Sequence, residues 1–347
     1  MNFICPKDII AHYLTELYSN LLKKYAYPPK ERFLLLSAER FVFCLTKYCL
    51  GVILSIDFTH ISEFFMFDSH IHMYYGKSDT PQEFLEKASS AGITGGNIIS
   101  LFPAKHGLVE DADQRWEYRL EKVLEFTSQT PGFHPLFWID PTADDFEKQI
   151  HTAAEQGIHG FKIICSHYYP HDTLPAVQVM AECHLPVLFH CGILYSKNCA
   201  AKYNRPIEFE ELLAVKGLRF ALAHAGWPWT DEFNAIVGEG RNGFFHSDIY
   251  VDITPGTPFV YRREVLKRLY MSGFDDLPNR VLWGTDGSTN NYPVKYVLLD
   301  IETDKKILSE IADPGNVFDV PGYKPETYID IWKKVSEDNL NAFHKKM

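Results

Sequence analysis

Two histidines one residue apart end an apolar run near position 70, in the sequence Phe67-Asp68-Ser69-His70-Ile71-His72. A run of this kind is typical of a buried strand. Because side chains alternate along a strand, His70 and His72 should lie on the same side. Neutral imidazole is the commonest metal ligand in proteins, so the pair could form half of a metal site. An isolated pair could equally be two structural histidines, and the rest of the chain has to decide.

Several other apolar runs also end in a side chain that can be ionised. These ends carry Lys162, His190, His224 and Asp286. With the first pair, they bring together four imidazoles and one carboxylate, the donor types of a catalytic zinc or a similar divalent ion. A purely structural role gives little reason for such groups at so many strand ends. The sequence therefore predicts a metal centre at these ends.

The elements that must position these residues alternate along the chain. Apolar runs predict eight strands, at 64–72, 95–102, 134–139, 160–165, 186–191, 219–224, 249–254 and 280–286. Stretches with helical spacing predict helices at 80–91, 113–128, 143–156, 174–183, 208–215, 231–237 and 261–271, followed by C-terminal helices at 292–312 and 326–344.

Continuous apolar strands that alternate with helices indicate parallel strands buried on both faces. The order predicts an α/β protein with a (β/α)₈ TIM-barrel fold, whose catalytic residues lie at the C-terminal ends of the strands. A doubly wound sheet is the alternative fold. It would need fewer strands, and it would more often show a glycine-rich phosphate loop after the first strand, which this sequence lacks.

Residues 1–65 differ from the remainder. We expect an N-terminal helical extension there, with helices at 9–25 and 31–50, followed by the barrel at 66–347. Nothing in the extension resembles a site, and Met66 stands directly before the first strand of the barrel. Our hypothesis is that the extension is dispensable or reflects an overextended gene start. A helical cap and an oligomer contact are the alternatives.

The composition is that of an ordinary soluble globular protein, with 46% hydrophobic and 23% charged residues in 347. A net charge of −11 argues against a nucleic-acid partner, which requires a basic face. Seven cysteines, an odd number, fit a reducing compartment, so we expect a cytoplasmic location. The apolar stretch 41–58 contains Lys47 and barely reaches the length of a membrane-spanning helix, so we expect no membrane partner. The start shows no secretory signal, and a homo-oligomer is left open.

The set of motifs resembles the amidohydrolase superfamily, in the amidohydrolase-related branch that contains metal-dependent decarboxylases and lactonases. The resemblance covers roughly residues 64–347. Besides the first-strand motif, it rests on Gly160-Phe161-Lys162, Phe189-His190-Cys191-Gly192, His224-Ala225-Gly226, Trp283-Gly284-Thr285-Asp286 and Asn339-Leu340-Asn341-Ala342. It implies one or two divalent ions, zinc before others.

The resemblance implies a role for each ligand. His70, His72 and Asp286 would bind the more buried ion, His190 would bind metal, and His224 would bind a second ion or contact the substrate. Asp286 would take the proton from metal-bound water. That role also has a physical basis, because a divalent ion lowers the pKa of bound water to ~7 and a nearby carboxylate can accept the proton. Catalysis would thus rest on Asp286 and His224.

Lys162 has two readings. In two-metal relatives a lysine at this strand end is carboxylated and bridges the ions, and only then would Lys162 be a metal ligand. In one-metal relatives the position is not a ligand. An uncarboxylated ammonium would repel a divalent ion, so Lys162 would then point at an anionic group of the substrate.

Four residues that follow the strands are further candidates for binding a small-molecule substrate. His167 follows the fourth strand, Arg205 the fifth, Trp227 the sixth, and Thr254 ends the seventh. Arg205 could bind a substrate carboxylate and Trp227 could form a pocket wall. The alternatives are a solvated loop histidine, helix-start packing for Trp227 and a turn at Thr254.

The favoured function is a metal-dependent hydrolase that acts on a small ester, lactone or amide. A metal-dependent decarboxylase or hydratase of a small carboxylic acid would use the same ligands. A barrel that binds metal without catalysis is disfavoured, because structural zinc sites are closed and usually rich in cysteine.

Overall fold

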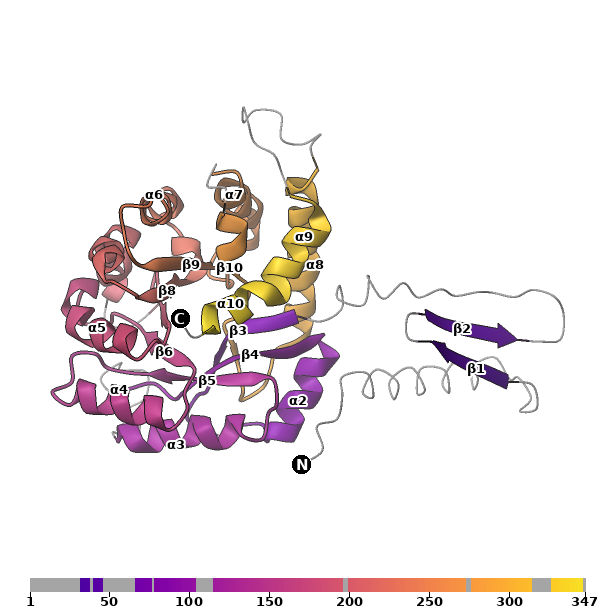
Figure 1. The fold of residues 1–347 in the computed structure, drawn as a ribbon, viewed down its shortest axis with the longest axis horizontal. Helices are drawn as coiled ribbons and strands as arrows, with labels where there is room; N and C mark the ends of the chain where they lie inside the picture. Colours follow the sequence, from indigo (N-terminus) through magenta and orange to yellow (C-terminus); the bar gives the residue numbers. More distant parts are fainter. Residues whose placement is uncertain are drawn as a thin grey trace. The chain divides into compact units, whose positions relative to one another are not determined.

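The computed structural model describes residues 32–37, 40–45, 66–76, 78–103, 115–195, 199–272, 276–313 and 326–345. The chain divides into two compact units, Met1–Ser62 and Glu63–Met347. The second unit is an α/β TIM barrel, in which helices surround a sheet of parallel strands (Figure 1). The predicted fold class is therefore confirmed for this unit.

The sheet of the barrel has the strand order β10-β9-β8-β7-β6-β5-β4-β3-β11. All its neighbouring strands are parallel. The strands are β3 (Met66–His72), β4 (Ile93–Ile99), β5 (Phe133–Trp138), β6 (Gly160–Ile163), β7 (Val187–Phe189), β8 (Arg219–Leu222), β9 (Asp248–Asp252), β10 (Val281–Leu282) and β11 (Gly287–Ser288). Each of the eight predicted runs contains a strand or adjoins one.

The last predicted strand is divided into two short pieces, and this division closes the barrel. β10 pairs with β9, whereas β11 pairs with β3 at the other edge of the sheet. Between the two pieces, Ser69 N–H donates to the carbonyl oxygen of Trp283 at 2.9 Å. Asp286 lies in the same segment with φ +54°. One stretch of chain thus joins the last strand of the sheet to the first.

Helices connect successive strands and cover the outside of the barrel (Figure 1). They are α2 (Pro81–Ser90), α3 (Trp116–Thr127), α4 (Phe146–Glu155), α5 (Leu174–Glu182), α6 (Thr230–Gly240) and α7 (Phe259–Tyr270). α2 shows a local cause of its start, because Thr80 and Glu83 form a capping box and Pro81 occupies the first turn.

Between β7 and β8 the predicted α-helix at 208–215 is instead a 3₁₀-helix, η5 (Pro206–Ala214). Pro206, Phe209 and Leu212 are all buried and lie three residues apart. Side chains with this spacing fall on one line in a 3₁₀-helix, so the spacing fits the observed form. A second short 3₁₀-helix, η4 (Ala200–Asn204), precedes it.

The C-terminal helices complete the unit. They are α8 (Val294–Ile311), α9 (Tyr328–Lys333), a single π-helical turn at Lys334–Asp338, and α10 (Asn339–His344). Leu340 and Phe343 of α10 pack in the same cluster as the inward residues of the strands. Phe343 stacks edge-on against Tyr250 of β9 at 5.1 Å between ring centroids. The last helix therefore fills the end of the barrel where the strands begin.

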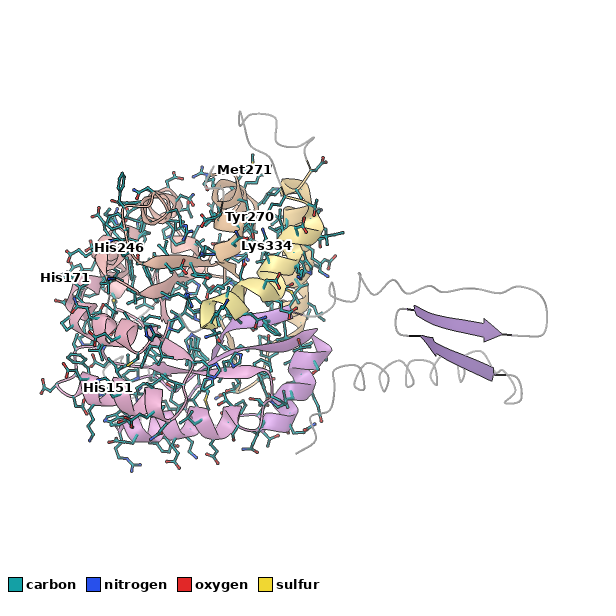
Figure 2. All side chains as sticks on the ribbon, viewed as in Figure 1. His151, His171, His246, Tyr270, Met271 and Lys334 are labelled. Carbon is teal, nitrogen blue, oxygen red and sulfur yellow. The ribbon has the colours of Figure 1, made fainter. Side chains whose placement is uncertain are left out.

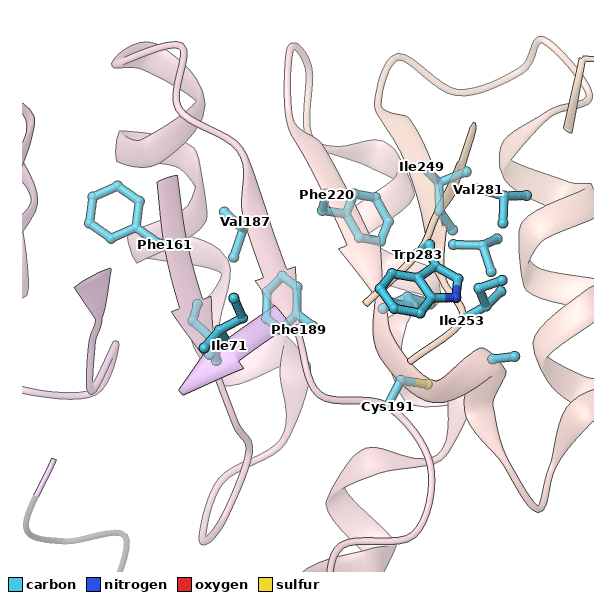
Figure 3. Packing of buried hydrophobic residues seen from close by; sticks show 14 of the residues in the cluster. Ile71, Phe161, Val187, Phe189, Cys191, Phe220, Ile249, Ile253, Val281 and Trp283 are labelled. Atoms are coloured by element: carbon cyan, nitrogen blue, oxygen red, sulfur yellow. The ribbon is translucent and has the colours of Figure 1, made fainter. Parts of the chain in front are cut away.

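Alternation along the strands divides the core into two clusters. The outward residues Phe161, Val187, Phe189 and Phe220 pack against the helices (Figure 3). The inward apolar residues, among them Leu188, form the second cluster inside the barrel. The alternation turns Lys162 and His190 inward, and it leaves Cys191 in the outer cluster, as expected from the sequence.

The described part of the first unit is an antiparallel pair, β1 (Arg32–Ser37) and β2 (Arg40–Leu45), in which Ser37 pairs with Arg40. The predicted helix at 31–50 is therefore wrong for these residues, and the one at 9–25 lies outside the described residues. Both strands are short apolar runs that contain aromatic or branched residues. Such runs suit strands, and periodicity alone does not separate them from helix.

Among the helices that the structure describes, none combines the length and the apolar character that crossing a membrane requires.

Candidate metal centre

Three predicted ligands meet at the C-terminal ends of β3 and of the segment between β10 and β11. His70 Nε2 lies 3.1 Å from His72 Nε2. Asp286 Oδ1 lies 3.6 Å from His70 Nε2 and 3.3 Å from His72 Nε2. Ligand atoms bound to one tetrahedral zinc at about 2.0–2.1 Å lie about 3.4 Å apart. The three side chains therefore fit one divalent ion.

The histidines of the site are buried, whereas the side chain of Asp286 is only partly buried. His70 is fully buried and the side chain of Asp286 is 39% exposed. Burial lowers the pKa of His70 and of His190 well below the usual range, and it also lowers the pKa of His72 and of His224. These imidazoles are therefore neutral near pH 7, the form that binds metal.

In contrast to the neutral histidines, Asp286 is in its charged form. Burial by itself would raise the pKa of Asp286, but the hydrogen bond with His72 and the neighbouring His70 and His224 outweigh it and hold the pKa below its usual range. The carboxylate is thus ionised. It stands in the left-handed backbone region, which a residue other than glycine rarely adopts.

Lys162 and His190 extend the centre into the barrel. Lys162 is fully buried, and its Nζ lies 3.1 Å from His70 Nε2. Burial lowers the pKa of Lys162 to about 8, against the opposing effect of Asp286 and Asp252. Nε2 of His190 is buried without a hydrogen-bond partner in the described protein. A buried nitrogen of this kind fits a metal ligand better than a structural histidine.

His224 lies beside the three-ligand cluster rather than within it. Its ring centroid is 4.8 Å from that of His190 and 5.5 Å from that of His70. His224 and Ala225 both have positive φ, +60° and +45°. Two successive non-glycine residues in this region are strained, and strain of this kind is concentrated at functional sites.

Two buried aspartates that were not predicted as site residues hold His70. Asp252, the last residue of β9, has Oδ2 at 2.9 Å from His70 Nδ1. Asp68 accepts hydrogen bonds from the His70 and Thr285 backbone N–H groups and from the Thr285 and Tyr292 hydroxyls. Burial raises the pKa of Asp68 to about 7. Asp252 ends an apolar run, so the criterion applied to the other strand ends would have found it.

Comparison with known sequences identifies the family. The family model described as amidohydrolase matches residues 67–314. The chain belongs to the amidohydrolase family. The predicted resemblance is therefore confirmed, and the protein is a metal-dependent, hydrolase-like enzyme. No curated protein matches the sequence.

A solved structure shows a similar fold. An amidohydrolase from Burkholderia multivorans with bound HEPES has a TM-score of 0.54 at 10% identity, over 81% of this chain and 99% of that chain. A dihydroorotase from Campylobacter jejuni has a TM-score of 0.48 at 14% identity, over 82% and 84%. At such identities the likeness of the first structure concerns the fold alone.

The predicted substrate contacts of this amidohydrolase lie in different surroundings. Exposed His167 lines a small pocket with Trp138, and the Trp138 ring is 5.4 Å from that of His72. Half-buried Trp227 lies 6.2 Å from the Tyr261 ring.

Arg205 has two partners in the folded chain. It forms an ion pair with Glu232 at 2.5 Å and lies over the Trp229 ring. Other histidines without a predicted role, His151, His171 and His246, lie at the periphery of the barrel unit (Figure 2).

Proposed function

We propose that this amidohydrolase uses zinc to hydrolyse a small ester, lactone or amide, with Asp286 as the general base and acid. The observation that carries the proposal is the arrangement of the three convergent ligands. Two neutral imidazoles are buried, while the carboxylate that completes the set is 39% exposed. A catalytic centre keeps an open position in this way, whereas a structural one is closed.

The ion would supply Lewis-acid activation of the carbonyl and a lowered pKa for water. His70, His72 and Asp286 would hold it. Ionised Asp286 can accept a proton from the attacking water and return it to the leaving group, because it faces both the ion site and solvent. His224, whose ring centroid lies 5.5 Å from that of His70, would bind a second ion or contact the substrate carbonyl.

Lys162 decides between one ion and two. A carboxylated Lys162 would bridge two ions with the help of His190, and a pKa near 8 leaves part of the amine in the neutral form that such a reaction needs. Metal analysis of purified protein separates the cases. Two ions per chain that fall to one or none in Lys162→Ala would support the bridge, whereas one ion in both proteins would reject it.

An uncarboxylated Lys162 favours a second candidate function. Its positive charge, 3.1 Å from His70, would suit a substrate carboxylate, as a decarboxylase or hydratase of a small carboxylic acid requires. His167 and Trp227 would contact the substrate in either case. Arg205 would first have to leave Glu232.

A substrate screen tests the proposed function. Zinc-loaded protein would be incubated with panels of lactones, aryl esters, amides and small aromatic acids, beside an Asp286→Asn control. We expect hydrolysis in at least one of the first three panels and its loss in the control. Release of carbon dioxide without incorporation of solvent oxygen would instead establish the decarboxylase, and silence across all panels would refute both.

We also propose that the barrel at 66–347 is the working part of the protein and that residues 1–65 are dispensable for the site. The boundary between the two compact units, at Ser62 and Glu63, supports this division. A variant that begins at Met66 should fold and bind metal as the full chain does. Loss of either property would refute the division.

We propose a cytoplasmic location for the protein. The described cysteines are all free, which supports this location; they are Cys165, Cys183, Cys191 and Cys199.

A further inference from the structure

The end of β9 connects two histidines of the site through one carboxylate. Asp252 is fully buried, and its two oxygens contact four different donors. Oδ1 accepts from the Thr254 backbone N–H at 2.7 Å and from the Thr254 hydroxyl at 2.6 Å. Oδ2 lies 2.9 Å from His70 Nδ1 and 3.4 Å from the Ser69 hydroxyl. Every lone-pair direction of this carboxylate is therefore in use.

Counting protons along these contacts fixes the state of both rings. A threonine hydroxyl has one proton and can accept through its oxygen. Because the Thr254 proton is directed to Asp252, its oxygen must accept from His224 Nδ1, which lies 3.1 Å away. His70 Nδ1 must likewise carry the proton that points at Asp252. Thr254 Oγ1 is also 3.4 Å from His70 Nδ1, but the contact with the carboxylate is the shorter one.

We propose that Asp252 and Thr254 act as a single positioning pair, which fixes the Nδ1–H tautomer of His70 directly and of His224 through the threonine hydroxyl. Both histidines then present the Nε2 lone pair. For His70 this lone pair faces His72, Lys162 and Asp286. Neither Asp252 nor Thr254 has to touch the ion or the substrate. The inference rests on the proposed metal centre and assigns the residues that prepare it.

Close packing holds the pair in place. A Cβ added at Gly284 would lie 2.6 Å from Thr254 Cγ2 and 2.9 Å from His70 Cβ. A Cβ added at Gly256 would lie 2.9 Å from Cβ and Cγ of His224. The two glycines thus bring main chain directly against the threonine and both histidines, so these groups have little room to choose other partners.

The tautomers can be measured without substrate. Full-length, metal-free protein labelled with ¹⁵N in its histidines would be examined by NMR, in which the two ring nitrogens report where the proton resides. The variants are Thr254→Val, which removes only the hydroxyl, Thr254→Ser, which keeps it, and Asp252→Asn. His70→Gln and His224→Gln proteins would assign the signals.

We expect the Nδ1–H form at both rings in the wild type and in Thr254→Ser. Thr254→Val should lose this form at His224 and keep it at His70. Asp252→Asn should lose it at His70 and keep it at His224, because the amide oxygen must face the two Thr254 donors and the NH₂ group then donates to His70 Nδ1. A merely structural role of Thr254 would leave the His224 tautomer unchanged in Thr254→Val. That result, or an unchanged His70 tautomer in Asp252→Asn, would overturn the proposal.

Zinc affinity gives a second measurement that does not depend on spectral assignment. Loss of a partner that orients a ligand typically costs 10–100-fold in metal affinity. In competition with a chelator, Asp252→Asn should therefore bind zinc about 10–100-fold more weakly, and Thr254→Ser about as tightly as the wild type. Unchanged affinity in Asp252→Asn would also overturn the proposal. Because neither measurement uses a substrate, a failed substrate screen would count against the proposed function alone.

Discussion

Replacing Asp304 by asparagine should destabilise the barrel strongly, because Asp304 neutralises a buried arginine. Its carboxylate is 1% exposed and accepts from Arg262 Nε at 2.9 Å and from Arg262 Nη2 at 2.7 Å. Trp283 Nε1 donates to the same carboxylate at 3.0 Å. The guanidinium also donates to the carbonyl of Ile253, at 2.5 Å. The ion pair thus joins α7 and α8 to the segments on either side of the site.

The size of the effect follows from the burial of the pair. Two unit charges about 4 Å apart attract each other by about 4 kcal/mol at an effective dielectric constant of 20. Leaving one charge of a buried pair without its partner typically costs about 3–5 kcal/mol. The free energy of unfolding of a domain is only about 5–15 kcal/mol. Asp304→Asn should therefore remove at least about a fifth of the stability.

Urea unfolding followed by circular dichroism measures this loss. Asp231→Asn is the matched control, because Asp231 pairs with Arg268 at 2.5 Å but has an 82% exposed side chain. The control should change the free energy of unfolding by less than about 0.5 kcal/mol. Replacing both members, as Arg262→Met with Asp304→Leu, should recover most of the loss, since a well-packed apolar pair can substitute for a buried ion pair. A loss below about 1 kcal/mol in Asp304→Asn, or equal losses in Asp304→Asn and the control, would refute the reasoning.

Three further predictions concern pH and metal. Burial and the charge of Asp304 raise the pKa of Asp300 to about 6, so its ionisation costs stability as pH rises from about 4 to 6. Asp300→Asn should therefore be more stable than the wild type at pH 7 and lose this advantage at pH 4. An advantage that is independent of pH in urea unfolding would contradict this prediction. Burial and the neighbouring histidines lower the pKa of His344 to about 3, so the unfolded chain binds the proton first and stability falls as pH drops below about 6.5. His344→Asn should therefore lose less of its free energy of unfolding between pH 6.5 and 4. An unchanged dependence of that free energy on pH would exclude His344 as a cause. Zinc at 100 times its dissociation constant should add about 2.7 kcal/mol to the free energy of unfolding, and the gain should vanish in His72→Asn; an equal gain in that variant would mean that zinc binds elsewhere.

Much of the barrel could be predicted because its strands are short apolar runs between clear helix signals. The strand ends then select the site, since parallel strands in a barrel bring their C-terminal ends to one mouth. His70, His72 and Asp286 meet there, although Asp286 lies more than 200 positions further along the chain. The hydrogen bond between Thr285 and Asp68 beside them spans 217 residues. The candidate ligands thus followed from residue type and place in the strand.

The partners of these ligands could not be predicted in the same way. The place of Asp252 at a strand end could have marked it as a candidate, but no spacing in the sequence links it to His70, 182 residues away. Likewise, Glu232 pairs with Arg205 in the folded chain, and no spacing in the sequence indicates this contact across 27 residues. The β1–β2 pair was missed because a six-residue apolar run fits a helix and a strand equally well.

The divided last strand determines when the candidate metal site can form as the protein folds. His70 and His72 belong to the first strand of the barrel, whereas Asp286 belongs to the segment that seals it. An ion bound by the first strand and by the segment of Asp286 would cross-link a loop of more than 200 residues. Closing a long loop restricts an unfolded chain more than closing a short one. During synthesis the histidine half exists long before the carboxylate half. The complete site can therefore form only after nearly all of the barrel has been made and closed, and metal uptake would serve as a late check that the ring is intact.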